Sequence, residues 1–180
     1  MPTAMGIDVG TKLHVTIMEP KSRMLLYTGE LKDFEEVDTL MLKFNTQTCV
    51  IDALPETRKV RELISRNKTK VWSCFYSDHQ KGNYLWKEDN NVVMVNRTES
   101  LDAGQLAFIR KNISLPQRNS MVELFANHIQ NLVKTVDEDL VTGDRRYVYK
   151  KLGPDHFGHS LNYCFIAATK MRGSSVSFFR

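Results

Sequence analysis

The sequence predicts a mixed α/β domain built on one central sheet, and three observations support this prediction. Three apolar segments follow one another near the N-terminus on short connections, which is typical of an antiparallel meander of strands. Further along, short apolar runs alternate with segments of helical period, which indicates parallel strands joined by helices. The chain has 180 residues, of which 42% are hydrophobic and 26% are charged, as in an ordinary globular domain. We therefore expect a single domain over residues 1–180.

The N-terminal meander is expected from three strand-like segments. In the second segment Leu13, Val15 and Ile17 occupy alternate positions, which is the period of a strand with one buried face. A tight turn near residues 10–12 separates this segment from the first. The three segments read MGIDV from Met5, LHVTIME from Leu13 and RMLLYTGEL from Arg23.

After the meander the apolar spacing changes to that of helices. Residues 33–44 carry one apolar helical face, and Pro55 lies in the first turn of a second predicted helix. A hairpin is expected over residues 138–152, with its turn at residues 142–144. The other predicted elements are strands over 48–54, 70–76 and 90–96 and helices over 55–66, 98–111, 120–134 and 154–168. Because strands and helices alternate, we expect helices on both faces of the sheet.

Composition excludes several classes of protein. The three cysteines, Cys49, Cys74 and Cys164, form no Cys-x-x-Cys pair, so neither a disulfide framework nor a cysteine zinc site is predicted, and we expect a reducing, intracellular setting. No cluster of His and Cys in the sequence predicts a zinc site. No apolar run approaches the length of a membrane span, no signal peptide opens the chain, and no P-loop motif is present. The net charge of +4 modestly favours an anionic partner.

Three aspartates occupy unusual places in the predicted elements. Asp8 lies within the first strand, Asp52 ends the fourth strand, and Asp155 opens the last helix. A buried, unpaired carboxylate is costly, so Asp8 needs an explanation. In a meander followed by a helix and a parallel strand, strands one and four are commonly neighbours, which would put Asp8 beside Asp52. Each acid also has an ordinary interpretation, because Asp52 suits a turn and Asp155 suits a helix N-cap.

Three carboxylates that meet at one locus repel one another, and divalent cations compensate this charge. Mg²⁺ binds a few carboxylates and keeps positions open for phosphate oxygens. Two ions about 4 Å apart stabilise both the attacking and the leaving oxygen in phosphodiester hydrolysis. A competing interpretation takes Asp8-Val9-Gly10-Thr11 as a phosphate loop of an actin-like ATPase, with LDAG at residues 101–104 as its second motif. That ATPase needs two copies of its fold, which one domain does not supply.

Longer segments of the chain resemble a known family. These are Asp52 followed by ALPETRKVRELI, the segment VNRTESLDAGQLAFIRKNISLP, and GPDHFGHSLNYCFIA. Together with Asp8 they resemble the C-terminal nuclease domain of the large terminase subunit of tailed bacteriophages, which belongs to the ribonuclease H-like group. The resemblance covers residues 5–168. It implies a ribonuclease H-like mixed sheet, with a meander plus parallel strands, helices on both faces and an added β-hairpin.

The resemblance also implies a function and its residues. The acidic triad of the family corresponds to Asp8, Asp52 and Asp155, which would hold two Mg²⁺ or Mn²⁺ ions and catalyse cleavage of double-stranded DNA with little sequence specificity. The nuclease would cut the concatemer during viral genome packaging in the host cell cytoplasm. Implied partners are the terminase ATPase domain, which is expected to be absent from this chain, the small terminase subunit and the capsid portal. A catalytically inactive DNA-binding or docking module, or an actin-like ATPase fragment, is the alternative.

Accessory residues follow from their spacing and charge. His159 lies one helical turn after Asp155, so it could orient that carboxylate, contact a phosphate or assist proton transfer, or it could simply pack. His156 is a weaker candidate for the same roles, while His14 and His128 are expected to be structural or solvated. The predicted hairpin carries a basic cluster that is expected to bind the DNA backbone, formed by Arg145, Arg146, Lys150 and Lys151.

Overall fold

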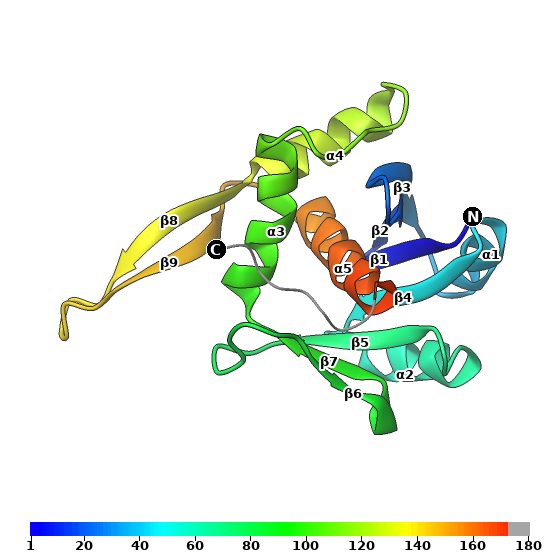
Figure 1. Ribbon diagram of the computed structural model, residues 1–180, viewed down its shortest axis with the longest axis horizontal. Helices are drawn as coiled ribbons and strands as arrows, with labels where there is room; N and C mark the ends of the chain where they lie inside the picture. The colour runs from blue at the N-terminus through cyan, green and yellow to red at the C-terminus, as the bar shows by residue number, and fades with distance from the viewer. Residues whose placement is uncertain (173–180) are drawn as a thin grey trace.

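The computed structural model describes residues 1–172, and residues 173–180 lie outside the description. Within these residues a seven-stranded sheet has the order β3-β2-β1-β4-β5-β7-β6 (Figure 1). The first three strands pair antiparallel, as the predicted meander requires. β4, β5 and β7 continue the sheet in parallel with β1, and β6 pairs antiparallel with β7. The strands are β1 Thr3–Val9, β2 Leu13–Glu19, β3 Met24–Leu31, β4 Thr46–Asp52, β5 Val71–Tyr76, β6 Leu85–Lys87 and β7 Val92–Val95.

Helices cover both faces of this sheet. The apolar side chains of α1 and α2 pack on the face that carries Met5, Ile7 and Val9 of β1. The side chains of α4 and α5 pack on the opposite face, where Ala4 of β1 and Val50 of β4 lie. The helices are α1 Glu35–Lys43, α2 Thr57–Arg66, the short 3-10 helix η1 Glu88–Asn90, α3 Arg97–Ile109, α4 Ser120–Gln130 and α5 His156–Met171. This architecture confirms the predicted mixed α/β sheet with helices on both faces.

Helix α5 lies directly against the first strand, and Gly6 makes this possible. A methyl group at Gly6 would lie 2.0 Å from the carbonyl oxygen of Ser160 and 2.1 Å from the amide nitrogen of Cys164. The packing is reinforced where the hydroxyls of Thr16 and Ser160 lie 2.6 Å apart, and where the Cys164 thiol donates to the Ala4 carbonyl at 3.3 Å. Because no side chain separates the two backbones, the position of α5 on β1 is fixed closely.

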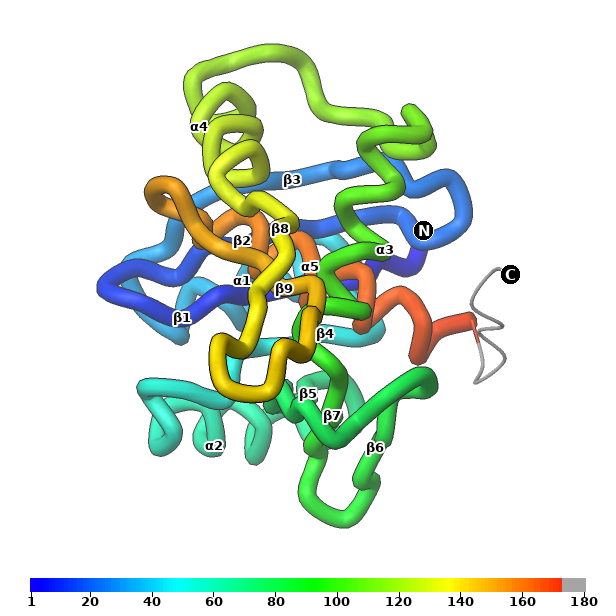
Figure 2. Tube along the Cα trace, turned by 90° about the vertical axis from the view of Figure 1, so that its left-hand side faces the viewer, coloured from blue at the N-terminus to red at the C-terminus, as the bar shows by residue number. Residues whose placement is uncertain are grey.

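The predicted hairpin forms a separate two-stranded ribbon, which begins at residue 132 and not at residue 138 as expected. β8 Leu132–Glu138 pairs antiparallel with β9 Arg145–Lys151, and Gly143 takes a positive φ of 75° in the turn. The ribbon extends away from the sheet in Figure 1 and lies in front of it in Figure 2. At its base, Asn131 Nδ2 donates to the Pro154 carbonyl at 2.7 Å. The hairpin is therefore anchored one residue from Asp155.

Two predicted helix boundaries are wrong. The helix expected over residues 120–134 ends at Gln130, because Leu132 and the residues after it pair with β9. The helix expected over residues 98–111 begins instead at Arg97, after the N-cap Asn96, whose side chain accepts a hydrogen bond from the Glu99 amide at 3.1 Å. Strand β6 and helix η1 were not predicted. Within residues 1–172, no helix is long and apolar enough to cross a membrane.

Candidate metal centre

The three aspartates gather where β1, β4 and the start of α5 meet. Ile7 of β1 pairs with Ile51 of β4 in parallel register, so Asp8 and Asp52 follow on neighbouring strands. Alternate residues of a strand share a face, and Gly6, two residues before Asp8, faces α5. Asp8 and Asp52 therefore lie on the α5 side of the sheet. Asp155 immediately precedes the first residue of α5, which brings it to the same edge.

Asp8 is buried and held by a histidine of α5. Its carboxylate oxygen Oδ2 lies 2.9 Å from His156 Nδ1. The hydrogen bond to Asp8 raises the pKa of His156, although partial burial of the imidazole opposes this. The cost of burying Asp8 is thus partly offset by a charge-assisted hydrogen bond.

Asp52 occupies the least compensated position of the three. One of its oxygens accepts a hydrogen bond from the Leu54 amide at 3.1 Å. Burial raises the pKa of the Asp52 carboxyl to about 6, and the negative charge of Asp8 adds to this shift. A carboxylate that is buried beside a like charge is stabilised in its ionised form by a cation. Asp52 is therefore a chemically suitable metal ligand.

Asp155 is oriented by His159, one turn further along α5. His159 Nε2 lies 3.3 Å from the Asp155 carboxylate, and the other ring nitrogen, Nδ1, lies 3.0 Å from the Tyr76 hydroxyl. Burial would raise the pKa of Asp155, but the hydrogen bond from His159, together with the nearby His159, Lys151 and His156, lowers it overall. Asp155 occupies the N-cap position of α5, as its alternative interpretation predicts, but its side chain makes no capping hydrogen bond.

Tyr76 was not predicted as part of this site. It ends β5 and contacts both His159 and Asn162, whose Nδ2 donates to the Tyr76 hydroxyl at 3.0 Å. The only sequence signal was its place at the end of a strand, two residues after Cys74, which pairs with Asp52. Tyr76 and Asn162 together fix the ring of His159 and thereby the carboxylate of Asp155.

Three histidines pack beside the acids. The rings of His14 and His156 stack with centroids 4.5 Å apart and an interplanar angle of 14°. His128 lies 5.7 Å from His14 and 5.8 Å from His156 between ring centroids. Burial lowers the pKa of both His14 and His128, and the nearby His156 lowers both further. His14 and His128 are buried, which agrees with the structural role among the two alternatives expected for them.

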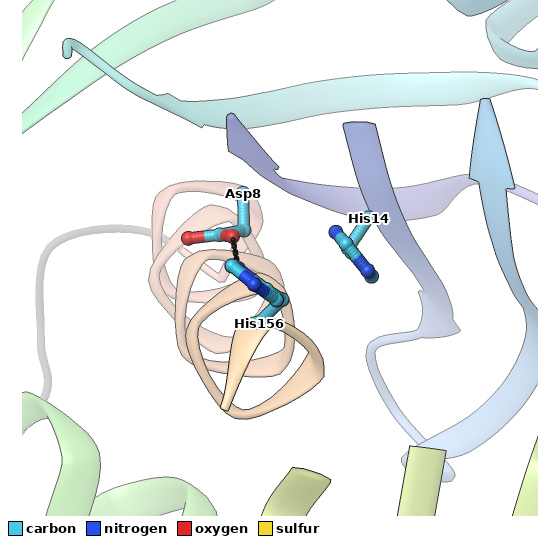
Figure 3. A group of neighbouring side chains, drawn as sticks. All are labelled: Asp8, His14 and His156. Carbon is cyan, nitrogen blue, oxygen red and sulfur yellow. Dashed lines mark hydrogen bonds and ion pairs between the residues drawn. The ribbon is translucent and has the colours of Figure 1, made fainter. Parts of the chain in front are cut away.

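One group of potential ligands is especially compact. Ligand atoms of Asp8, His14 and His156 all lie within 4.8 Å of one another, and no other group of three or more His, Cys, Asp or Glu in residues 1–172 meets this criterion (Figure 3). Asp52 and Asp155 lie around this group, since Asp52 interacts electrostatically with Asp8 and Asp155 with His156. The ligand role of the three aspartates remains a prediction.

The four basic residues predicted to bind DNA lie on β9. Arg145 pairs with Glu138 at 3.3 Å, Arg146 with Asp137 at 3.9 Å and Lys150 with Asp137 at 3.3 Å, and all three basic side chains are well exposed. Lys151 is close enough to Asp155 to lower the pKa of that carboxyl. Exposed ion pairs of this kind are weak, so these cations are available to an anionic partner.

Comparisons of the sequence with known proteins find no match, so the fold itself indicates the class. No protein-family profile matches the chain, and no curated protein matches its sequence. The sheet order, the helices on both faces and the separate hairpin agree with the predicted ribonuclease H-like α/β fold.

Solved structures of phage nucleases share this fold. The large terminase nuclease from thermophilic phage G20c superposes with a TM-score of 0.59 and 9% identity, over 91% of this chain and 81% of that one. The structure of the G20c nuclease with bound magnesium superposes with a TM-score of 0.59 and 10% identity, over 91% of this chain and 80% of that one. The Thermus phage P74-26 large terminase nuclease domain superposes with a TM-score of 0.57 and 10% identity, over 91% of this chain and 77% of that one. The predicted resemblance is thus confirmed for the fold: the chain folds like a large terminase nuclease domain.

Proposed function

We propose that this protein is a metal-dependent endonuclease that cuts double-stranded DNA with little sequence specificity during viral genome packaging. The observation that carries the proposal is the convergence of Asp8, Asp52 and Asp155 at one edge of a sheet with the fold of terminase nucleases. The three acids come from β1, β4 and the start of α5, which are far apart in sequence. A bound divalent cation would stabilise carboxylates that are gathered in this way.

The residues fit Mg²⁺ or Mn²⁺, because carboxylate oxygens are the ligands that these hard cations prefer. Burial and the negative charge of Asp8 raise the pKa of Asp52, and a bound cation would favour the ionised form of this carboxyl. We propose that Asp8, Asp52 and Asp155 hold two such ions. When bound, the ions would activate a water and stabilise the charge on the leaving oxygen of the phosphodiester.

The side chains around the acids position them for this role. His159 holds Asp155 while Tyr76 holds His159, and His156 holds Asp8. Partners of this kind fix the orientation of ligating carboxylates and are needed for full metal affinity. We therefore assign His156 and His159 as positioning residues of the centre. Lys151, beside Asp155, would attract a phosphate of the DNA to the acids.

The hairpin supplies the proposed DNA contact. Arg145, Arg146, Lys150 and Lys151 would hold phosphates of the DNA backbone, a contact without sequence information. Because the hairpin base is anchored beside Asp155, DNA held along β9 would lead toward the acids. The family resemblance implies that the partners would be a terminase ATPase domain, the small terminase subunit and the capsid portal. The protein would act in the host cell cytoplasm.

The test is cleavage of a supercoiled plasmid with Mg²⁺, with Mn²⁺ and with a chelator. The wild-type protein should nick and linearise the plasmid with either metal and not with the chelator. Asp52→Asn should lose the activity, whereas Asp33→Asn, a matched change at an exposed aspartate, should retain it. A wild-type protein that binds DNA but cuts it with neither metal would contradict the proposal and favour an inactive DNA-binding module.

A further inference from the structure

His14 carries a buried nitrogen without a partner. Its residue is 6% exposed, and Nδ1 makes no hydrogen bond within residues 1–172. The other ring nitrogen, Nε2, lies 3.3 Å from the Glu30 carboxylate on the neighbouring strand. A buried polar atom without a partner is costly. Its presence beside two other potential ligands therefore points to a bound group that satisfies it.

The contact with Glu30 prepares His14 to bind a metal. When Nε2 carries the proton and donates it to Glu30, Nδ1 keeps a free lone pair. A carboxylate that holds the far nitrogen of an imidazole in this way is the common outer partner of metal-binding histidines. Glu30 is itself paired with Lys12 at 2.5 Å, which fixes the carboxylate in place. The tautomer that this arrangement favours is the one that can ligate from Nδ1.

We propose that Asp8, His14 and His156 form a binding site for a transition-metal ion of the Zn²⁺ class. Two imidazoles and one carboxylate are a donor set that suits Zn²⁺, with a fourth position left for water or a phosphate oxygen. The set differs from the three carboxylates proposed for Mg²⁺ or Mn²⁺, although both use Asp8. The three residues come from β1, β2 and the start of α5, and Figure 3 shows Asp8 joined to His156 by a hydrogen bond with His14 on one side of the pair.

Closing the site requires a small movement. Ligand atoms that lie within 4.8 Å of one another must approach to roughly 3.4 Å, since Zn–N and Zn–O bonds are about 2.0–2.1 Å in a tetrahedron. His14 is held by its strand and by Glu30, whereas the His156 side chain is 44% exposed and can turn. We therefore expect the stacked rings of His14 and His156 to separate when the ion binds.

The test is calorimetric titration of Zn²⁺ into the whole chain in excess Mg²⁺. The wild-type protein should bind one Zn²⁺ ion, and His14→Gln and His156→Gln should each weaken binding at least tenfold, since even the loss of an outer partner costs about 10–100-fold. His79→Gln, at an exposed histidine, should change nothing. The three cysteines are buried in the folded chain and do not compete for the ion. Melting curves of each variant show whether it is folded.

Co²⁺ gives a second measurement, because its visible absorption reports histidine and carboxylate ligands directly. The absorption bands should form in the wild-type protein and in Asp52→Asn, and they should be lost in His156→Gln. The His156 side chain is partly exposed, so we expect this variant to fold. Absence of Zn²⁺ binding in excess Mg²⁺, or wild-type affinity in both histidine variants, would overturn the proposal. Neither measurement uses DNA cleavage, so the result stands whether or not the protein is a nuclease.

Discussion

The three aspartates differ in how their charge is compensated. Asp8 has His156 and Asp155 has His159, while the partners of Asp52, which are the Leu54 amide, the nearby His159 and the Tyr163 hydroxyl, do not outweigh burial and the like charge of Asp8. The pKa of Asp52, raised to about 6 by burial, means that the folded protein binds this proton more tightly than the unfolded chain does. The protonated group therefore stabilises the fold below its ordinary pKa of 3.8, and this contribution is lost as the pH rises through about 6.

Asp52→Asn should therefore stabilise the metal-free protein at neutral pH. A shift from 3.8 to about 6 corresponds to at most about 3 kcal/mol, and partial solvent access reduces this to roughly 1–2 kcal/mol. The gain should be present at about pH 7.5 in a chelator and disappear near about pH 3.5, where aspartic acid is largely protonated in both states. Denaturant unfolding at both pH values measures it, and Asp33→Asn is the control. If the unfolding free energies of Asp52→Asn and the wild type differ by the same amount at the two pH values, the raised pKa of Asp52 is contradicted.

Among the elements, the packing of α5 on β1 determines the site geometry. Gly6→Ala would place a methyl group 2.0–2.1 Å from backbone atoms of Ser160 and Cys164, so α5 must move away. We expect a decrease of about 3 kcal/mol or more in unfolding free energy and a loss of DNA cleavage, because Asp155 moves with α5. Thermal melts and the plasmid assay measure the two effects.

Gly104→Ala is the matched control for this substitution. Its added methyl group would meet its nearest neighbours, on Phe165 and Leu161, at 3.7–3.8 Å, which is ordinary contact. Alanine in a helix is favoured over glycine by roughly 0.5–1 kcal/mol, so this variant should be slightly more stable than the wild type. If Gly6→Ala and Gly104→Ala behave alike, the close approach of α5 to β1 does not determine the site.

The hairpin gives a second prediction at this scale. The paired change of Arg145 and Arg146 to Ala should weaken DNA binding, and the slope of log affinity against log salt should become shallower by roughly one for each phosphate that the variant no longer binds. Stability should hardly change, because the ion pairs with Glu138 and Asp137 are exposed. Filter binding or fluorescence anisotropy over a salt series measures the slope.

A matched double variant, Arg58→Ala with Arg61→Ala, removes the same charge from α2, where both arginines are exposed. It should keep more of the salt dependence than the hairpin variant, although the two variants have the same net charge. The same slope in both variants would show that only total charge matters and that β9 makes no particular contact with DNA.

For the molecule as a whole, metal binding and folding should be linked. An ion that binds only the folded protein adds about 2.7 kcal/mol of stability at about 100 times its dissociation constant, which for a chain of 180 residues raises Tm by roughly 5–10 °C. We expect this increase with Mg²⁺ in the wild-type protein and not in the double variant Asp8→Asn, Asp52→Asn. Differential scanning calorimetry measures it; an undiminished increase in the double variant would place Mg²⁺ elsewhere.

Much of this architecture could be predicted from the sequence because local patterns determine it. Alternation in LHVTIME and helical spacing in residues 33–44 predict a strand and a helix, and the structure has both there, although the strand is buried on both faces and not on one. The boundary after Gln130 could not be predicted in this way, because residues 131–134 continue the helical spacing and only their pairing with β9 makes them a strand.

The candidate site shows the same division. Asp8 and Asp52 could be singled out because an acid is out of place in an apolar strand or at its end, and Asp155 because it opens the last helix in a segment that carries the family resemblance. His14 and Tyr76 could not be recognised as members, because a histidine or a tyrosine in a strand is common and its neighbours come from distant parts of the chain. His14 meets His156 across the sheet and α5, and Tyr76 meets His159 of α5. Such contacts depend on tertiary packing, which local spacing does not encode.

Because α5 packs on β1, the candidate metal centre can form only after the last helix has been synthesised. Asp8 and its partner His156 are 148 positions apart along the chain, so every earlier element leaves the ribosome before the centre can close. Contacts between such distant segments form late and slowly. A chain that stops before residue 155 would carry Asp8 and Asp52 without α5 over them. The proposed nuclease would therefore be inactive in a growing polypeptide until α5 has docked, and proteolysis ahead of α5 would inactivate it.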